Sequence, residues 1–391
     1  MTAFMSNSAD VLVIGGGPGG LYAAERLARA GMHAVVCEEH DRVGDPVHCT
    51  GIVATESFDD FDLPRGATLN DLAAASFISP SGIKVHYTPP APLATVIDRP
   101  AFDRALAERS VAAGVDLRVG ARVSRLDVQP DGVRARAGDS VIHARLAVLA
   151  CGANYAFQRR LGLGFPAYHL HSAQRELPAR RSSDVELHFG RAVAPQGFGW
   201  AVPVTRSEGL RVRVGVMTER DPVGCYTRML DRVRDCWEIE DDGQPPRQKI
   251  LPLGPIERTV ADRVMAVGDA AGLVKPTTGG GIYYAVLTAS LAADVAAEAL
   301  RKDRLDAAFL SAYERAWRRE LDQELDAQQA LRDVASQLTD EALDQLFELA
   351  NTDGIMPIVR TTARFNRHRD LIRAIFRHPP ARRILFKHVF G

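Results

Sequence analysis

The sequence predicts an α/β protein: a Rossmann-type dinucleotide-binding domain, a second domain built on a β-sheet, and a helical C-terminal region. Three observations predict this class. A strand–turn–helix–strand unit with a glycine-rich turn lies near the N-terminus, a second glycine-rich turn follows a strand near residue 264, and strand-like alternation separates the two.

Length and composition limit the possible classes. The 391 residues predict two or three domains, and a composition of 46% hydrophobic and 25% charged residues excludes disordered and fibrous proteins. The net charge of −1 argues against a nucleic-acid-binding protein, which usually carries a basic excess.

The five cysteines predict neither a disulfide framework nor a metal site, because their number is odd and no C-x-x-C pair occurs. This usage fits a reducing compartment. No export signal is expected at the N-terminus. The most apolar helical stretch, residues 285–300, carries Asp294 and Glu298 and is expected to be too short to span a bilayer. We therefore expect a cytoplasmic protein.

The first glycine-rich turn lies in a complete nucleotide-binding unit. A strand at 10–14, a helix at about 21–30 and a strand at 34–37 surround the pattern G-x-G-x-x-G. In this unit, amides at the helix N-terminus hold the phosphates of a dinucleotide.

Each glycine of this turn has a separate physical role. Gly15 allows the tight turn, Gly17 lets the backbone approach a pyrophosphate, and Gly20 lets the helix pack on the strand. Glu38 ends the second strand, where its carboxylate can accept hydrogen bonds from the hydroxyls of a ribose.

Segments farther along the chain indicate which dinucleotide binds. Residues 98–103 begin a helix that runs to about residue 113. A strand at 264–267 is followed by Asp269, which can accept a hydrogen bond from a ribityl hydroxyl, and by the turn at 276–281 that enters a long helix. The N-terminus of that helix suits a ring whose reduced form is anionic, so a flavin fits better than a nicotinamide.

Together these motifs resemble the FAD-dependent enzymes of the p-hydroxybenzoate hydroxylase-like fold. Two further segments narrow the resemblance. Pro46–Ile52 resembles the cysteine-containing loop of the geranylgeranyl reductase family, and Pro195–Pro203 resembles its P-x-G-x-x-W-x-x-P segment. The similarity covers residues 9–300 and weakens in the helical C-terminal region.

The resemblance implies FAD as the cofactor and a polyprenyl lipid as the substrate. The expected FAD-binding residues come from both turns and from the cysteine loop. They are Gly15, Gly17, Gly19, Gly20, Glu38, Cys49, Thr50, Gly51, Ile52, Arg99, Val123 (through its backbone), Asp269, Gly279, Gly280, Gly281 and Ile282.

The expected substrate-binding residues are Phe198, Trp200, Pro203 and Tyr283. Phe198 and Trp200 share one strand face and line an isoprenoid channel or form sheet core. We favour the channel, because glycines at 197 and 199 leave room for a ligand. The spacing does not distinguish Tyr283 from Tyr284.

Cys49 is the candidate catalytic residue, because the family pattern places it near the flavin; its alternative role is that of a small buried hydrophobe. For His48 we favour a structural role with the ring directed to solvent. Cys151-Gly152 stands where related hydroxylases carry the Asp-Gly pair linked to the use of NAD(P)H. The electron donor therefore stays open between NAD(P)H and a ferredoxin-like protein.

The predicted FAD-binding domain is discontinuous, with residues 1–75, 96–160 and 255–325. Residues 76–95 and 161–254 are expected to form the substrate-binding sheet, and residues 326–391 to form helices broken at Pro357 and Pro379.

The C-terminal tail is strongly basic. From Arg360 onward, nine Lys and Arg residues stand against one acid, Asp370, so the tail carries +8 and the rest of the chain −9. The tail is either a solvated helix face or a basic amphipathic face on an anionic membrane, which would place the protein peripherally on the inner membrane face. The apolar tail residues are Ile372, Ile375, Phe376, Ile384, Leu385, Phe386, Val389 and Phe390.

The predicted function is an FAD-dependent reductase that hydrogenates isolated double bonds of a geranylgeranyl-type chain on a lipid, quinone, diphosphate or pigment carrier. One alternative is a flavin-dependent monooxygenase or halogenase. Halogenases need a lysine, and Lys84 is the one lysine in the first half of the chain, which argues against that activity. The other alternative is a non-catalytic prenyl-binding electron-transfer flavoprotein.

Overall fold

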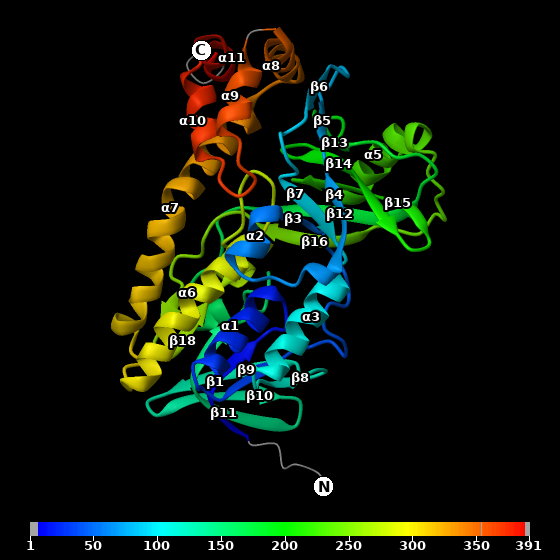
Figure 1. Cartoon of the computed structure of the whole chain (residues 1–391). Coiled ribbons are helices and arrows are strands. Elements are labelled where there is room, and N and C mark those ends of the chain that lie inside the picture. The colour runs from blue at the N-terminus through cyan, green and yellow to red at the C-terminus, as the bar shows by residue number, and fades with distance from the viewer. Residues whose placement is uncertain (1–6, 353, 388–391) are drawn as a thin grey trace.

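The computed structural model describes residues 7–352 and 354–387. Figure 1 shows a lower region with a sheet and helices, a second sheet above it, and C-terminal helices beside both. The predicted α/β class is confirmed. Val389 and Phe390 of the predicted amphipathic tail lie outside the described residues.

An eight-stranded sheet forms the lower region, and its strands come from three separate parts of the chain. They are β1 (Ser8–Ile14), β2 (Ala34–Cys37), β8 (Asp116–Arg118), β9 (Val123–Gln129), β10 (Gly132–Ala137), β11 (Ser140–Leu149), β17 (Val260–Ala261) and β18 (Val264–Ala266). The order β18-β11-β1-β2-β8 is parallel, with β1 at its centre. The apolar strands β2 and β18 are fully buried, as expected in a sheet covered on both faces.

Three helices lie side by side on this sheet (Figure 1). They are α1 (Pro18–Arg29), α3 (Arg99–Ala112) and α6 (Ile282–Arg301). Helix α1 packs between the other two, which places the two glycine-rich turns close together in space. The strands and helices expected around both turns are therefore present, with ends that differ by a few residues.

The length of helix α6 differs from the sequence-based expectation. Its 20 residues are long and apolar enough to cross a membrane by length and composition alone, so the expectation that this stretch is too short was wrong. Half of its apolar window is buried inside the protein, and its alanine-rich face belongs to the core beneath α1.

A seven-stranded sheet forms the upper region. Its strands are β5 (Ala75–Ile78), β6 (Lys84–Tyr87), β12 (His169–Pro178), β13 (Val185–His188), β14 (Phe198–Arg206), β15 (Gly209–Thr218) and β16 (Arg247–Pro252). Helix α5 (Pro222–Trp237) covers one face, and Trp200, Val202 and Met217 occupy the other. The second face therefore remains available for a site.

A third, three-stranded sheet connects the two regions. It consists of β3 (Ile52–Ala54), β4 (Thr68–Leu72) and β7 (Ala94–Ile97), and the short helix α2 (Thr55–Asp60) follows β3. No sequence pattern predicted this sheet. Because β3 directly follows the Cys49 loop, the small sheet fixes that loop between the two larger regions.

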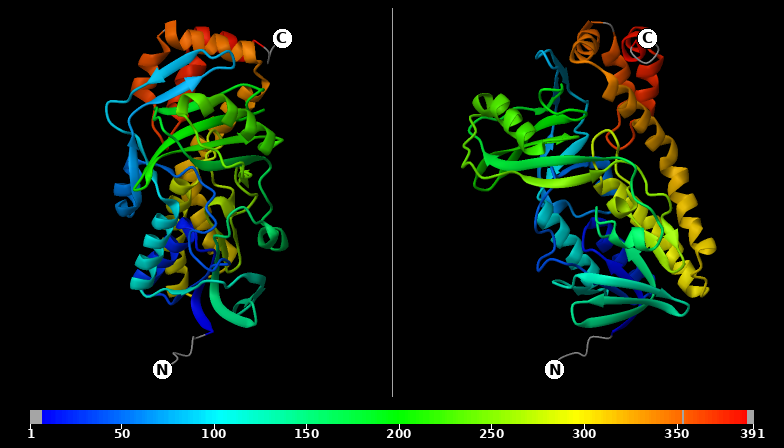
Figure 2. Two further views of the ribbon diagram at one scale, coloured as in Figure 1. Left: turned by 90° about the vertical axis from the view of Figure 1, so that its right-hand side faces the viewer. Right: turned by 180° about the vertical axis from the view of Figure 1, so that it is seen from behind.

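The C-terminal helices are α7 (Ala307–Gln337), α8 (Asp340–Thr352), α9 (Ile355–Thr362), α10 (Arg369–Arg377) and α11 (Pro379–Phe386). Helix α7 runs from the lower region toward the top of the molecule, as the right-hand view in Figure 2 shows. The expected helical region is present, although its predicted start at residue 326 falls inside α7. The other domain boundaries remain a prediction.

The two predicted helix breaks behave differently. Pro379 is the first residue of α11, as expected, but Pro357 lies within α9. This position is tolerated because a proline in the first turn of a helix removes an N–H that has no partner within the helix. The break instead precedes α9, where Gly354 adopts a positive φ of 78°.

Candidate functional site

The first glycine turn has the geometry that the sequence predicts. Gly15 has a φ of +112°, and a β-carbon there would collide with the carbonyl oxygen of Ala150. A β-carbon at Gly20 would collide with the carbonyl oxygen of Gly15, so helix and strand pack closely. At Gly17, by contrast, a β-carbon would meet no atom within 4 Å. The turn is therefore closed toward the protein at Gly15 and Gly20, and open at Gly17.

Glu38 fixes this turn from the side. Its Oε2 accepts a hydrogen bond from the Gly16 N–H at 2.7 Å, and its Oε1 accepts one from the His40 N–H at 2.9 Å. The carboxylate is 9% exposed. It thus lies at the end of β2 beside the glycine turn, where both of its carboxylate oxygens hold the backbone.

The second turn places Asp269 and the start of α6 together. Asp269 lies just after β18, and a β-carbon at Gly281 would come within 2.7 Å of Asp269 Oδ1. No side chain caps α6, so the first amides of this helix are available to a ligand. Such an uncapped N-terminus stabilises negative charge.

The Cys49 loop is held by two residues that the sequence analysis missed. Gln174 accepts hydrogen bonds from Thr50 Oγ1 at 2.8 Å and from Trp200 Nε1 at 3.1 Å, and it donates to Cys49 O at 3.0 Å. Arg213, which is 4% exposed, donates to Thr50 O at 2.6 Å and to Glu176 Oε2 at 2.8 Å. These residues lie on β12 and β15 and tie the loop to the seven-stranded sheet.

Sequence patterns could not identify these two residues as site residues. Their strands alternate like any half-buried strand, and only strand pairing brings them under the loop. The one weak signal was an arginine and a glutamine in strands that were expected to be half-buried, because a buried polar side chain needs hydrogen-bond partners.

Arg99 and Cys49 meet at the cavity. Arg99 forms a two-point ion pair with Asp103, at 3.1 and 2.8 Å, and its guanidinium also interacts with the Cys49 thiol. Burial lowers the pKa of Arg99, but Asp103 first and Cys49 next outweigh burial, so the pKa is raised overall. Cys49 Sγ itself accepts a hydrogen bond from the Gly51 N–H at 3.2 Å.

His48 lines the cavity, so the expectation that it faces solvent was wrong. Its Nε2 is 2.7 Å from Ser172 Oγ, and its Nδ1 is buried without a hydrogen-bond partner among the described residues. Burial, followed by the charges of Lys249 and Arg247, lowers the pKa of His48 to about 4. The ring is therefore neutral at physiological pH.

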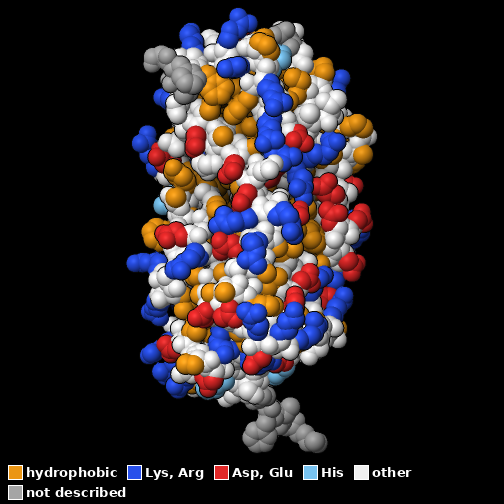
Figure 3. Space-filling model, turned by 90° about the vertical axis from the view of Figure 1, so that its left-hand side faces the viewer, with side chains coloured by type: hydrophobic (Ala, Val, Ile, Leu, Met, Phe, Trp, Pro, Cys, Tyr) orange, Lys and Arg blue, Asp and Glu red, His pale blue; other side chains and the backbone are white. Residues whose placement is uncertain are grey.

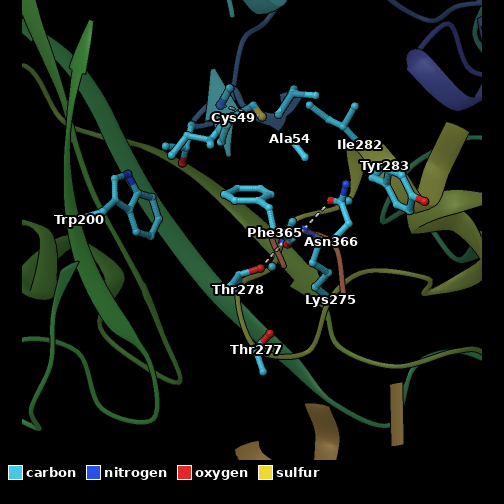
Figure 4. A pocket seen from close by; sticks show the side chains of 18 of the residues that line it. Cys49, Ala54, Trp200, Lys275, Thr277, Thr278, Ile282, Tyr283, Phe365 and Asn366 are labelled. Carbon is cyan, nitrogen blue, oxygen red and sulfur yellow. Dashed lines mark hydrogen bonds between the residues drawn. The ribbon is translucent and has the colours of Figure 1, made fainter. Parts of the chain in front are cut away.

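These groups surround one cavity of about 680 Å³. Figure 4 shows Cys49 and Trp200 around it, with Phe365, Lys275 and Tyr283 on its other sides. Most of the predicted site residues line it, namely Gly17, Gly19, Gly20, Cys49, Thr50, Gly51, Ile52, Arg99, Phe198, Trp200, Asp269, Gly279, Gly280, Gly281, Ile282 and Tyr283. Tyr283 rather than Tyr284 reaches the cavity, because Tyr284 is fully buried against Gln328.

Four predicted site residues do not line this cavity: Gly15, Glu38, Val123 and Pro203. Gly15 packs against Ala150, Glu38 accepts a hydrogen bond from the Gly16 N–H, and Val123 is buried at the start of β9. The prediction that Pro203 binds substrate was wrong. Strand alternation turns its side chain away from the face that carries Trp200 and Val202.

The reason given for Phe198 and Trp200 also needs correction. Both side chains line the cavity, but Gly197 and Gly199 do not make room for a ligand. A β-carbon at Gly197 would collide with the carbonyl oxygen of Met217, and one at Gly199 would approach Met229 of α5 to 2.5 Å. The glycine that makes room for the Trp200 ring is Gly215, on the neighbouring strand β15.

The C-terminal region contributes a wall that the sequence analysis missed. The segment 363–368, between α9 and α10, places Phe365 and Asn366 in the cavity beside Lys275 (Figure 4). The His368 ring approaches Thr277 Oγ1 to 2.8 Å, and Asn366 Nδ2 donates to Glu56 Oε1 at 3.0 Å. This segment, called the tail loop below, therefore closes the site from the side of α7.

The residues present fit FAD. An open Gly17 beside two closely packed glycines, an acid at the end of β2, and an uncapped helix opposite Asp269 match the parts of a flavin dinucleotide. Among residues 7–352 and 354–387, no group of three His, Cys, Asp or Glu side chains is placed to hold a metal ion.

Comparisons with known proteins give the relationship. Residues 8–222, more than half of the chain, match the family described as FAD binding domain, and residues 228–365 match the one described as lycopene cyclase protein. Digeranylgeranylglycerophospholipid reductase 2 of Methanothermobacter thermautotrophicus is 33% identical over 353 residues, which cover 86% of this chain and 90% of that protein. Digeranylgeranylglycerophospholipid reductase of Methanocaldococcus jannaschii is 30% identical over 370 residues, which cover 88% of this chain and 92% of that protein.

Solved structures agree on the fold. A geranylgeranyl bacteriochlorophyll reductase-like protein from Thermoplasma acidophilum has a TM-score of 0.84 at 23% identity and covers 97% of this chain and 99% of that chain. A halogenase in complex with FAD has a TM-score of 0.68 at 16% identity and covers 94% of this chain and 85% of that chain. The sequence relatives and the shared fold together identify the relationship: this chain belongs to the geranylgeranyl reductase family of FAD-dependent oxidoreductases.

Proposed function

We propose that this protein hydrogenates isolated double bonds of a polyprenyl chain, and that the chain is carried on a glycerophospholipid. The observation that supports this most is the apolar cavity that continues from the two glycine turns toward the C-terminal helices. The names of the relatives at 30–33% identity support the lipid carrier. The structural likeness to halogenases concerns the fold alone.

The cavity walls suit a hydrocarbon chain. The seven-stranded and three-stranded sheets supply one wall, and α7, α9 and α10 supply the other. The apolar side chains that line these walls are Leu72, Phe77, Val185, Leu187, Val202, Leu331, Val359, Leu371, Ile372 and Ile375. Burial of a chain against such walls is favourable at roughly 25 cal/mol per Å² and requires no polar partner from the lipid tail.

The protein's part in the chemistry is to position the double bond and exclude water. FAD, held by the two glycine turns, would supply the hydride for one carbon of the double bond. The rigid tie from Gln174 to both Cys49 and Trp200 sets the distance between the cysteine loop and the aromatic wall, and the substrate must pass between them. Cys49, beside Arg99, is the side chain that we propose holds the proton for the other carbon.

The proposal for the electron donor rests on one difference between this sequence and the related hydroxylases. Cys151 occupies the position where related hydroxylases carry an acid linked to NAD(P)H, and burial raises the pKa of its thiol to about 11. A neutral thiol there supports a donor other than a nicotinamide, such as a ferredoxin-like protein. Comparing the rate of flavin reduction by NADH, NADPH and reduced ferredoxin tests this directly.

Lipid mass spectrometry after anaerobic reduction tests the function. The FAD-loaded protein, dithionite and digeranylgeranylglycerophospholipid are expected to give products heavier by two mass units per reduced double bond. Geranylgeranyl diphosphate and a prenylated quinone serve as competing carriers. Cys49→Ala is expected to keep the yellow colour and lose most of the product.

The alternatives give different results. Lipid that binds tightly with unchanged mass would indicate a carrier flavoprotein and contradict the reductase. A long-lived oxygen adduct absorbance after aeration of the reduced protein, together with halogenation of an added aromatic compound, would indicate the oxygenase. Both outcomes are readable in the same preparation.

The tail charges support peripheral binding to an anionic membrane as a further proposal. Figure 3 shows Lys and Arg side chains in the upper part of the face that carries α7 and the C-terminal helices. The basic residues around the hollow at the end of α10 and α11 are Arg377, Arg382, Arg383 and Lys387. The apolar tail residues Ile372 and Leu385 are buried, so this contact would be electrostatic rather than an inserted amphipathic face.

A further inference from the structure

Lys275 is buried at the second glycine turn and, among residues 7–352 and 354–387, forms no ion pair with a carboxylate. Its side chain is 3% exposed, and its two hydrogen bonds go to neutral oxygens, Phe365 O at 2.8 Å and Asn366 Oδ1 at 2.9 Å. Its Nζ also lies 4.6 Å from the centre of the Phe365 ring. Burying an ammonium without a direct ion pair is unfavourable, so the position is not explained by packing alone.

The position of this lysine points to a role toward the cofactor. Lys275 immediately precedes the turn 276–281, and its Nζ lies 3.7 Å from the place that a β-carbon of Gly280 would take. The same turn leads into the uncapped N-terminus of α6, and Lys275 lines the cavity. When Lys275 is protonated, its charge therefore lies beside the turn that leads into a helix end that is already partly positive.

The charged surroundings of Lys275 come from three other elements. Glu56 on α2 and Glu324 on α7 face it, and His368 of the tail loop lies nearby. Burial lowers the pKa of Lys275 to about 7, with both glutamates acting in the opposite direction. The lysine is therefore poised so that a nearby negative charge would favour its protonated form.

We propose that Lys275 is a positioning residue that holds a positive charge behind the glycine turn and thereby stabilises reduced FAD relative to oxidised FAD. Reduction by dithionite adds two electrons and one proton to the ring, which leaves the reduced ring anionic near neutral pH. The tail loop holds the ammonium in place through Phe365 and Asn366. This role is separate from the identity of the lipid substrate.

The midpoint potential of bound FAD in substrate-free protein tests the proposal. In Lys275→Met, the affinity for reduced FAD is expected to fall at least tenfold more than the affinity for oxidised FAD. A tenfold change corresponds to a fall of about 30 mV for a two-electron couple. Lys302→Met, at the exposed far end of α6, is the matched control and is expected to leave the potential unchanged.

Lys275→Gln keeps a hydrogen-bond donor for the tail loop and removes the charge, so it separates charge from packing. It is expected to lower the potential as Lys275→Met does, and it decides the matter if the methionine variant does not fold. A yellow, folded glutamine variant with the wild-type potential would overturn the proposal. Equal loss of affinity for oxidised and reduced FAD would also overturn it, because the lysine would then act only in holding the cofactor or the fold.

Discussion

Gly17 and Gly20 belong to the same turn, but they are glycine for different physical reasons. Gly20 has no room for a β-carbon because the carbonyl oxygen of Gly15 lies against it. Gly17 has open space and ordinary extended dihedrals, with φ −79° and ψ 176°. Glycine is required at position 20 by the packing of the chain on itself, and at position 17 by the approach of a ligand.

Alanine substitutions should separate these two requirements. Gly20→Ala is expected to reduce the free energy of unfolding of the apoprotein by about 1–3 kcal/mol, because the added methyl group overpacks the turn. Gly17→Ala is expected to leave apoprotein stability nearly unchanged and to weaken FAD binding at least tenfold. Denaturant titration of the apoprotein and flavin fluorescence titration measure the two quantities. A Gly17→Ala protein that binds FAD normally would contradict this assignment.

At the residue scale, side-chain identity predicted part of the site well. Cys49, Trp200, Asp269 and Arg99 line the cavity as the motifs indicated. Gln174 and Lys275 were missed, since neither belongs to a motif that has chemistry of its own. Their roles depend on partners that are distant in sequence: the Cys49 loop and Trp200 for Gln174, and the tail loop for Lys275.

At the scale of elements, the tail loop matters most. It lies about 90 residues after Lys275 in the sequence, yet it contacts the second glycine turn at Lys275 and Thr277. Glu324 of α7 accepts a hydrogen bond from the Arg369 N–H at 3.1 Å, which fixes the loop against the long helix. Helices α7, α9 and α10 and the tail loop therefore line the candidate site, so charge substitutions are a better probe of the tail than deletion.

His368 makes this loop sensitive to acid. Burial, followed by the charge of Lys275, lowers the pKa of His368 to about 4, from an ordinary value of 6.5. Since the unfolded chain binds this proton more readily, stability is expected to fall as the pH decreases from about 6.5 to 4. Each such histidine contributes a slope of up to about 1.4 kcal/mol per pH unit.

His368→Gln is expected to flatten the dependence of the free energy of unfolding on pH over that interval. Urea titrations at several pH values measure it, and His33→Gln at an exposed position is the control. An identical pH dependence in the His368 variant and the wild type would show that this ring does not titrate as its burial implies.

At the scale of the whole molecule, charge is distributed unevenly. The last 32 residues carry +8 and the preceding chain −9, and this basic segment forms α10 and α11, which lie in the upper part of the molecule in Figure 1 beside α8. The cavity extends toward the same helices, α9 and α10. A negatively charged membrane surface would therefore attract the end of the molecule that carries α9 and α10, which line the apolar cavity.

Neutralising the four basic residues of the hollow should weaken binding to vesicles that contain phosphatidylglycerol. At about 1 kcal/mol per basic residue near the surface, the combined change to Gln is expected to reduce binding more than tenfold at low salt. The residues are Arg377, Arg382, Arg383 and Lys387. Four exposed arginines elsewhere form the control set, namely Arg104, Arg134, Arg136 and Arg319.

Vesicle sedimentation at increasing salt concentration measures the effect, with FAD absorbance as a check on folding. Salt-insensitive binding, or equal loss in both sets of variants, would rule out a specific contact through the tail.

The sequence by itself determined the two nucleotide-binding turns, the α/β class, the FAD cofactor and the family. These depend on local backbone rules, where a glycine or an acid at a fixed offset from a strand has one physical reason to be there. Only the tertiary structure decided that Tyr283 faces the cavity, that Pro203 does not, and that the tail loop closes the site over Lys275. These outcomes depend on strand pairing and helix packing between distant segments, and no local pattern encodes which partner a buried polar group will meet.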